Sequence, residues 1–349
     1  PLEPFTLPRM LNTAPPTRLL DLRRAHYASF ADYDPSETVL RHAWTFFTEQ
    51  PQAQWYNGQT FVAGIYAFPS AGPSTWAFGY FETEPNPDPN VFAAEWAALR
   101  TQYPGAWVGP MLGSTFLPYR VVTEDSGAPY FPGEWRSRPE YVELLVDQNP
   151  AKTITYRSAE RTDFDGVIQV SQPFLDRWTE QGLALKPLDP SDSEHVNALR
   201  GMIDAVFGGN FGYQPLTEPQ FDRWRASLAS THGGTPLLHW VQLGERRVGF
   251  SYLFALDDGT VIFKTIGLLP EFQAQGLGNA VAGALHQLAQ RRQAPRCIYA
   301  LVQTDNRVNR TPPAGVVPWG ADPFAVDPRR ADDDRNAFAL ERMPVTVDE

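Results

Sequence analysis

One stretch of the chain decides its fold: the apolar run Thr260-Val-Ile-Phe-Lys-Thr-Ile-Gly-Leu-Leu269, then Pro270, then the polar turn Glu271-Phe-Gln-Ala-Gln-Gly-Leu-Gly278. The apolar run predicts a strand, which Pro270 ends. From Leu277 onward apolar residues recur at i, i+3, i+4, i+7 and i+8, which predicts an amphipathic helix with one buried face. A second strand is predicted at Cys297–Val302. The stretch therefore predicts a βαβ unit with a glycine turn before its helix.

The two glycines of the turn, Gly276 and Gly278, predict a place where an anion binds. Without a Cβ the backbone turns sharply, and amide N–H groups can approach a ligand closely. The first N–H groups of a helix have no internal partner, and the helix dipole adds partial positive charge. Val281 occupies the third glycine position of the dinucleotide fingerprint, and no Gly-Lys-Ser/Thr follows for a triphosphate loop. An ordinary glycine turn opening a helix is the alternative.

The pattern Gln273-x-x-Gly276-x-Gly278, after a strand ending in Leu-Leu-Pro, resembles the acyl-CoA pyrophosphate loop of the GNAT superfamily of N-acetyltransferases. The resemblance covers residues 182–306, where strand, two helices, three strands, helix and strand follow in the order of that superfamily. It fails over residues 311–320.

The first half of the chain repeats the order of elements of the second half. Two strands at Thr60–Phe68 and Ser74–Glu82 are followed by a loop, a helix from about Val91 to Arg100, and a strand at Ala106–Gly109. The loop, residues 83–90, holds three prolines and no glycine. Proline lacks the N–H that would contact a pyrophosphate, so we expect that this copy does not bind CoA in the same manner.

A segment of this first half, Gly109-Pro-Met-Leu-Gly-Ser-Thr-Phe-Leu-Pro-Tyr-Arg120, is similar to one in the first lobe of long, two-lobed GNAT members. The predicted fold class is α/β (α+β), with two tandem GNAT-like domains, each a twisted mixed β-sheet flanked by helices. We expect a degenerate GNAT-like domain at residues 1–181 and a GNAT domain that binds acetyl-CoA at residues 182–349.

Composition narrows the class of protein further. With 349 residues and 42% hydrophobic content, the chain can form two domains with sizeable cores. No run of about 20 apolar residues predicts a membrane span, and a net charge of −11 argues against a nucleic-acid partner. No secretory signal is visible at Pro1, and the single cysteine, Cys297, lies in a predicted core strand. We therefore expect a cytoplasmic protein, a monomer or homodimer.

Metal chemistry has no support in the sequence, because the six histidines show no metal-ligand spacing and no cysteine partner. Five arginines lie near the glycine turn in sequence and could meet the phosphates of CoA, although solvated arginines at helix ends are commoner. They are Arg291, Arg292, Arg296, Arg307 and Arg310.

The resemblance implies the positions that bind acetyl-CoA, the expected cosubstrate. The pantetheine arm pairs with the backbone of the fourth strand, here Ile266, Gly267, Leu268 and Leu269. The pyrophosphate takes amide N–H groups of the loop, and Asn306 is a further family-type contact or, equally, a plain helix cap. The loop residues are Gln273, Ala274, Gln275, Gly276, Leu277, Gly278 and Asn279.

The catalytic base is harder to place. An amine with a pKa of ~10.4 must lose its proton to attack a thioester, which costs about 4.6 kcal/mol at pH 7. Family members often carry a carboxylate on the fourth strand, but here the matching stretch is Phe263-Lys264-Thr265. Lys264 could lower the pKa of an adjacent amine or bind an acidic acceptor. A solvated lysine at a strand edge is the alternative.

The sequence does not contain the tyrosine that the resemblance implies as the catalytic acid. Many members place a tyrosine after the Asn306 segment, but here two prolines stand at residues 312 and 313. Tyr213, in the loop above the expected acceptor site, is a candidate acid, or a packing residue. Alternatively the thiolate leaves unaided, since a thiol pKa near 8.5 makes it a good leaving group.

The function predicted is direct transfer of an acetyl group from acetyl-CoA to an amine of a small-molecule or peptide acceptor. Two alternatives stay open. In the first, the chain would be a non-catalytic pseudo-enzyme that binds acyl-CoA as a sensor or scaffold. In the second, it would form an amide on a thiol-sugar or an antibiotic, as some two-lobed relatives do.

Overall fold

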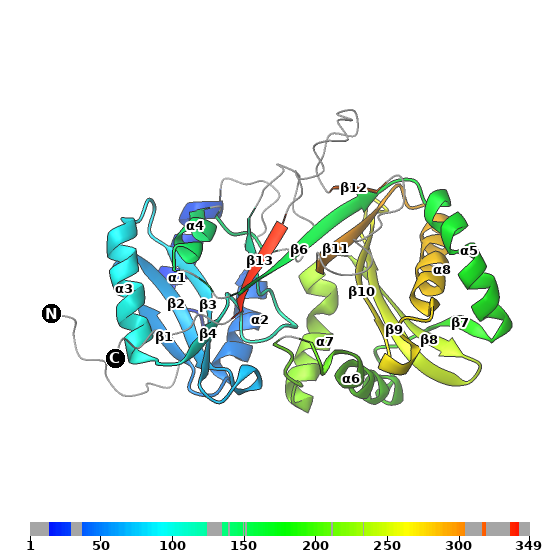
Figure 1. Ribbon diagram of the computed structural model, residues 1–349, viewed down its shortest axis with the longest axis horizontal. Helices are drawn as coiled ribbons and strands as arrows, with labels where there is room; N and C mark the ends of the chain where they lie inside the picture. The colour runs from blue at the N-terminus through cyan, green and yellow to red at the C-terminus, as the bar shows by residue number, and fades with distance from the viewer. Residues whose placement is uncertain are drawn as a thin grey trace. The chain divides into compact units, whose positions relative to one another are not determined.

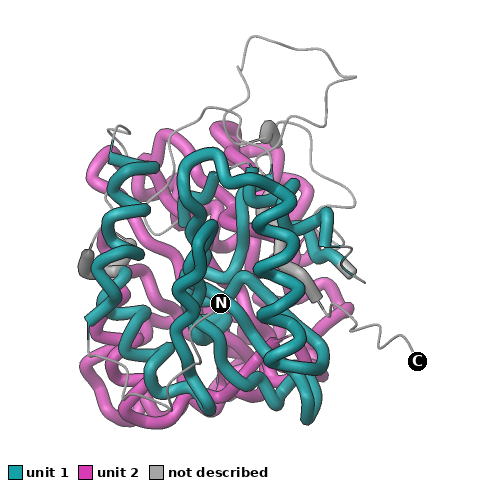
Figure 2. Tube along the Cα trace, turned by 90° about the vertical axis from the view of Figure 1, so that its left-hand side faces the viewer, with its two compact units in different colours: residues 1–123, 134–155, 337–349 teal, residues 124–133, 156–336 magenta. Residues whose placement is uncertain are grey.

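A computed structural model describes the chain in two compact units, coloured separately in Figure 2. Unit 1 comprises residues 1–123, 134–155 and 337–349, and unit 2 comprises residues 124–133 and 156–336. The sequence predicts a domain boundary after residue 181. That boundary stays a prediction, because the compact units are defined by contacts and not by repeats. The described residues are 14–28, 37–123, 135–138, 140–148, 150, 152–210, 212–232, 234–303, 316–318 and 336–341.

Unit 1 is built on a mixed sheet in the order β1-β2-β3-β4. The first three strands are antiparallel, and β3 and β4 are parallel. A short strand, β5, pairs with β13 near the end of the chain. The strands are β1 (Gln54–Asn57), β2 (Phe61–Ala67), β3 (Thr75–Thr83), β4 (Ala106–Val108), β5 (Val121–Val122) and β13 (Asn336–Glu341).

Aromatic side chains explain why this sheet is covered on both faces. Phe92 and Trp96 of α3 pack against Phe61 of β2, while Trp44 of α2 packs against Tyr80 of β3. Both strands are buried along nearly their whole length, as expected when helices cover both faces. The helices are α1 (Thr17–Tyr27), α2 (Glu37–Thr48), the 3-10 turn η1 (Pro69–Ala71), α3 (Pro89–Gln102) and α4 (Glu140–Val146).

Unit 2 has the larger sheet, in the order β6-β11-β10-β9-β8-β7, with β12 paired to β6. Only β10 and β11 are parallel, and the other neighbours are antiparallel. The strands are β6 (Lys152–Arg161), β7 (Leu183–Pro187), β8 (Thr235–Leu243), β9 (Arg246–Ala255), β10 (Val261–Leu268), β11 (Cys297–Gln303) and β12 (Val316–Pro318).

Helices flank both faces of the unit 2 sheet, as Figure 1 shows. Helices α5 and α8 pack together on one face, and α6 and α7 contact the other through β8, β9 and β10. The apolar face predicted from Leu277 onward is buried on the sheet. The helices are α5 (Asp165–Glu180), α6 (Ser193–Phe207), α7 (Glu218–His232), the 3-10 turn η2 (Pro270–Phe272) and α8 (Leu277–Arg291).

The predicted fold class is confirmed: each unit is a mixed sheet flanked by helices, and β7 to β11 follow the predicted order of elements. None of the helices in the described ranges is long and apolar enough to cross a lipid bilayer.

Candidate functional site

A gap opens in the unit 2 sheet where its two parallel strands part. The strands β10 and β11 pair only over three positions, the last being Phe263 with Tyr299. Beyond that point β10 stays paired with β9 as far as Leu268, while β11 stays paired with β6 as far as Gln303. Each strand thus follows its outer neighbour, and among the described strands none pairs with the inner edge of residues 265–268.

The exposure of Ile266 fits this gap. Ile266 lies on a central strand, yet its side chain is 38% exposed, one of three large hydrophobic side chains exposed in the described part of the chain. Its neighbour Gly267 lies under α6, where a Cβ would come within 3.0 Å of Val206. Leu268 is buried and Leu269 half-buried. An extended apolar ligand laid along β10 would cover surface that otherwise faces water.

The loop after β10 is held by its own glutamine side chains. Gln273 donates from Nε2 to the carbonyl oxygen of Leu268 at 2.8 Å, and Gln275 donates from Nε2 to the carbonyl oxygen of Glu271. Gln273 therefore ties the loop to the last residue of β10. This tether fixes the backbone of the loop beside the open end of the gap.

Gly276 is required by the backbone at the start of α8. It is the N-cap residue, with φ of +82°, in the left-handed region that side chains disfavour. A Cβ there would also lie 2.5 Å from the ring of Phe174 in α5. Gly278 differs, because the nearest atom to an added Cβ is 3.9 Å away, on Leu268. The first glycine shapes the turn, and the second leaves space above it.

The amide groups at the start of α8 are open to a ligand. No side chain caps this helix. Residues 273–275, 278 and 279 are exposed. Among the described residues, no backbone carbonyl or side chain accepts a hydrogen bond from the N–H groups of residues 274–279. Unpaired donors at the positive end of a helix dipole suit an anion with several oxygen atoms.

Lys264, a predicted catalytic candidate, lies where the gap begins. The register of β10 against β9 shifts between Phe263 and Thr265, so Lys264 is the extra residue of a β-bulge. Bulges redirect side chains and end regular pairing. The backbone of β10 therefore leaves its regular course at the residue where it separates from β11. Whether Lys264 takes part in chemistry stays a prediction.

Tyr213, the other candidate, is engaged with α6. Its hydroxyl donates a hydrogen bond to Oδ1 of Asp204. Burial and this carboxylate raise the pKa of the Tyr213 phenol well above its usual value. A phenol in this setting gives up its proton less readily, which favours a role in holding the loop over a role as an acid. The catalytic role of Tyr213 stays a prediction. Asn306 lies outside the described residues.

Three of the five arginines near the loop in sequence lie within the described residues, and these three do not gather at the loop. Arg291 and Arg292 lie at the far end of α8, which at about 1.5 Å per residue is roughly 20 Å from its first turn. Arg296 forms ion pairs with Glu160 and Asp258 at 3.2 and 3.5 Å. Arg307 and Arg310 lie outside the described residues.

An arginine that the sequence analysis did not consider does reach the loop. Arg177, in the last turn of α5, donates from Nη2 to the carbonyl oxygen of Gln275 across 98 positions of the sequence. Only the packing of α5 against α8 brings these two residues together. No local pattern in the sequence carries this information.

Beneath the sheet, a buried polar cluster joins α8 to β11. His286 donates from Nδ1 to the carbonyl oxygen of Ala282 at 2.7 Å, and its Nε2 accepts the hydroxyl hydrogen of Tyr299 at 2.6 Å. Burial lowers the pKa of His286 to about 4 and raises that of Cys297 to about 12. These groups are neutral at pH 7, and Cys297 is buried as predicted. The described residues contain no group of three or more metal-ligating side chains.

Comparison with known proteins supports the interpretation of this site. Residues 202–310 match the sequence model of the Acetyltransferase (GNAT) family, a span that includes the gap, the loop and α8. No curated protein matches the chain.

Several solved structures share features of the chain at low identity. A tandem GNAT protein from the clavulanic acid biosynthesis pathway is 12% identical with a TM-score of 0.48, and 93% of each chain is covered. A GCN5-related glucosamine N-acetyltransferase region of a fungal multi-domain GH3 β-N-acetylglucosaminidase is 8% identical with a TM-score of 0.49 (93% of this chain, 36% of that one). The L-PGS from Bacillus licheniformis is 12% identical with a TM-score of 0.36 (82% and 76%).

These TM-scores all lie below 0.5. The parted strands and the uncapped glycine turn, inside the matched span, define an acetyltransferase domain of the GNAT type in unit 2. The expected GNAT domain is therefore confirmed for residues 202–310 of the chain.

Proposed function

We propose that unit 2 binds acetyl-CoA and transfers its acetyl group directly to the amine of a small-molecule or peptide acceptor. One observation carries the proposal: within a segment that matches the GNAT family, β10 leaves β11 and is followed by a helix whose first amides are uncapped and exposed.

The polarity of the site sets the direction of the ligand. The diphosphate of the carrier lies on the amides of residues 274–279, beyond the end of β10, while the N–H of Gln273, also expected to contribute, donates to the carbonyl oxygen of Pro270 at 3.2 Å. The pantetheine arm then runs back along residues 266–269, beside the exposed Ile266. The acetyl end lies where the gap begins, next to the bulge at Lys264. This arrangement brings the thioester to the only residue of β10 that departs from regular pairing.

The chemistry rests mainly on positioning. The neutral amine attacks the thioester carbonyl carbon and forms the C–N bond. The C–S bond breaks, the thiolate leaves with its electron pair, and the proton that the amine nitrogen loses ends on the thiolate to give free CoA thiol. Holding the two reactants in one geometry supplies much of the rate enhancement in such reactions. A positive charge on Lys264 would favour the neutral form of a neighbouring amine, because two like charges repel. Tyr213 is retained as a candidate acid for the departing thiolate, with its hydrogen bond to Asp204 as the argument against that role.

Isothermal titration calorimetry with acetyl-CoA tests the binding step. Gly278→Val places a branched side chain into the open space over the first turn of α8 and should weaken binding at least roughly tenfold. Gly201→Val is the matched control, because Gly201 also lies in an exposed helical position with no atom within 4 Å of its added Cβ. Absence of binding by the unmodified protein at millimolar acetyl-CoA would refute the proposal.

Release of free thiol from acetyl-CoA in the presence of a panel of primary amines tests the transfer step. Turnover that depends on an added amine supports an N-acetyltransferase. Binding without turnover by any amine would instead favour the pseudo-enzyme, a sensor or scaffold for acyl-CoA. The pseudo-enzyme is retained as a second candidate function because residues 263–265 contain no carboxylate that could act as the base.

A further inference from the structure

We infer that Arg177 is a binding residue for the diphosphate of CoA, contributed by α5 from outside the glycine loop. This inference rests on the proposed function and extends it. Its consequence is selectivity: unit 2 should prefer CoA thioesters to pantetheine thioesters that lack the diphosphate.

The position of the guanidinium carries the inference. Arg177 donates from Nη2 to the carbonyl oxygen of Gln275, the residue directly before the N-cap of α8. The same nitrogen lies 3.7 Å from the position of a Cβ at Gly276. The guanidinium is thus fixed beside the amides that we assign to the diphosphate. A group held there lies within reach of any anion that those amides bind.

The hydrogen-bonding capacity of Arg177 is mostly unused. A guanidinium has five N–H donors, and the bond to Gln275 takes one. The side chain is exposed and its guanidinium lies over the ring of Trp178, a contact that uses none of these N–H donors, and among the described residues it forms no ion pair. Its planar fork matches the oxygen atoms of a phosphate, which is why arginine forms strong, paired contacts with such groups.

The other arginine close to the loop behaves differently. Both guanidinium groups lie over an aromatic ring, Arg177 over Trp178 at 5.0 Å and Arg246 over Phe272 at 4.8 Å, but Arg246 also forms an ion pair with Glu271 at 2.7 Å. Its charge is balanced by a carboxylate, and its role at the loop is structural. Of these two cations, Arg177 is therefore the one whose charge stays available to a bound anion.

The Gln275 contact also explains why the charge stays in place. A free arginine loses several rotamers when it binds a ligand, and this entropy cost weakens binding. Here the packing of α5 on α8, through Phe174 against Gly276, already fixes the base of the side chain. The bond to Gln275 fixes its tip. The cation is therefore positioned before the ligand arrives.

Calorimetry with CoA, dephospho-CoA and S-acetylpantetheine tests the inference in the full-length chain. Arg177→Gln should weaken CoA and dephospho-CoA alike, roughly tenfold to hundredfold, since both carry the diphosphate. It should leave S-acetylpantetheine unchanged and make CoA binding less sensitive to salt. Arg177→Lys keeps the charge without the planar fork, so its affinity for CoA should lie between that of the unmodified protein and that of Arg177→Gln. Arg291→Gln, at the far end of α8, is the matched control and should bind as the unmodified protein does.

Three outcomes would overturn the inference. Arg177→Gln could bind CoA as tightly as the unmodified protein, or it could weaken all three ligands equally, which would make Arg177 a support for the loop alone. Loss confined to CoA, with dephospho-CoA unaffected, would move the contact from the diphosphate to the 3′-phosphate. If the unmodified protein binds no CoA, the proposed function fails first, which is a separate result.

Discussion

The two units share a strand-helix-strand order but differ where their parallel strands part. In unit 1, β3, α3 and β4 follow one another, and in unit 2 β10, α8 and β11 do so. Each parallel strand pair spans three positions before its regular pairing ends. The two units differ beyond that point: in unit 1 other groups of the chain bond to the backbone of β3, whereas in unit 2 no described strand pairs with the inner edge of residues 265–268.

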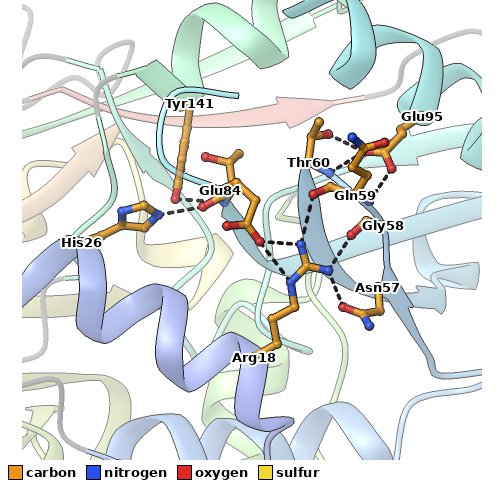
Figure 3. Close-up of polar contacts among 10 residues, drawn as sticks. Arg18, His26, Asn57, Gly58, Gln59, Thr60, Glu84, Glu95 and Tyr141 are labelled. Carbon is orange, nitrogen blue, oxygen red and sulfur yellow. Dashed lines mark hydrogen bonds and ion pairs between the residues drawn. The ribbon is translucent and has the colours of Figure 1, made fainter. Parts of the chain in front are cut away.

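The edge of β3 in unit 1 is closed by the protein itself. The N–H of Met111 donates to the carbonyl oxygen of Phe78 at 2.7 Å. Further along, the N–H of Thr83 donates to the hydroxyl of Tyr141 at 3.2 Å, and its carbonyl oxygen accepts from Nε2 of His26 at 2.7 Å, with both side chains shown in Figure 3. No backbone group of Thr83 is left for the arm of an acyl carrier.

The helix starts differ in the same way. In unit 1, Oδ1 of Asp88 accepts hydrogen bonds from the N–H groups of Asn90 and Val91 at 2.8 and 3.4 Å. This internal carboxylate takes the place of an external anion at the start of α3. In unit 2 the N-cap is Gly276, which has no side chain to offer. The carboxylate cap and the proline-rich loop are consistent with the expectation that the first repeat does not bind CoA in the same manner, which stays a prediction.

The largest expected effect concerns the closed end of β3, where Arg23 and Glu82 form an ion pair with side chains only 4% and 2% exposed. Oε2 of Glu82 also accepts the hydroxyl hydrogen of Tyr141 at 2.6 Å. Glu82→Gln leaves the charge of Arg23 buried without its carboxylate. We expect the free energy of unfolding of unit 1 to fall by about 3–5 kcal/mol, measured by urea denaturation followed through tryptophan fluorescence.

Glu84→Gln is the matched control for this variant. Glu84 pairs with Arg18 at 2.6 Å, but the two side chains are 41% and 30% exposed (Figure 3). Exposed pairs contribute under about 1 kcal/mol, because water and salt screen them. Equal losses in the two variants would mean that the buried pair does not close unit 1 in the way described.

A second prediction is that acid destabilises the core beneath α8 in unit 2 more than the core beneath α3 in unit 1. In unit 1, Trp96 of α3 faces Trp107 of β4, whereas in unit 2 His286 of α8 faces Tyr299 of β11. Burial lowers the pKa of His286 to about 4, against about 6.5 in an unfolded chain. The unfolded state therefore binds the proton first as the pH falls. The contribution of neutral His286 to the free energy of unfolding is fully present above pH 6.5. It is lost as the pH falls from 6.5 to 4, by up to about 3 kcal/mol.

The measurement is the free energy of unfolding at pH 7, 5.5 and 4.5. His286→Phe should remove the part of the acid-dependent loss that His286 contributes, while His239, whose pKa burial also lowers, keeps its own part. The variant should also lower the stability of unit 2 at pH 7, because Tyr299 loses its acceptor. His195→Gln, at a half-buried position in the same unit, should keep the acid dependence of the unmodified protein. An unchanged acid dependence in His286→Phe would contradict the assignment.

Much of the fold was predictable, because its signals are local. Strand-length apolar runs gave β2, β3 and β10, and helical periodicity from Leu277 gave α8. The glycine turn was predictable for the same reason, since a left-handed N-cap demands a glycine at residue 276. Proline content alone indicated that the first copy would differ.

What the sequence could not reveal depends on contacts between distant residues. The splitting of β10 from β11 requires strand register, which depends on pairing with β9 and β6. The hydrogen bond from Arg177 to Gln275 depends on how α5 packs. Tyr213 was predictable as a candidate, but its bond to Asp204 was not. Sequence proximity left Arg291 and Arg292 as possible phosphate contacts beside the commoner alternative of solvated arginines at a helix end, and helix geometry places both at the far end of α8.

The smallest effect is expected from a substitution that gives the helix start of unit 2 a carboxylate, as the helix start of unit 1 has. Asn279 lies exposed in the first turn of α8, and Asn279→Asp adds one negative charge at nearly constant shape. The charge complements the helix dipole, as Asp88 does in α3, so stability should hold or rise by about 0.3–1 kcal/mol. It also repels a diphosphate, so acetyl-CoA should bind roughly tenfold more weakly. Gln293→Glu adds the same charge beyond the other end of α8 and should leave binding unchanged. If both variants weaken binding equally, net charge and not the helix start governs affinity. If neither does, the open turn is not where the diphosphate lies, and the contrast between the two units loses its functional meaning.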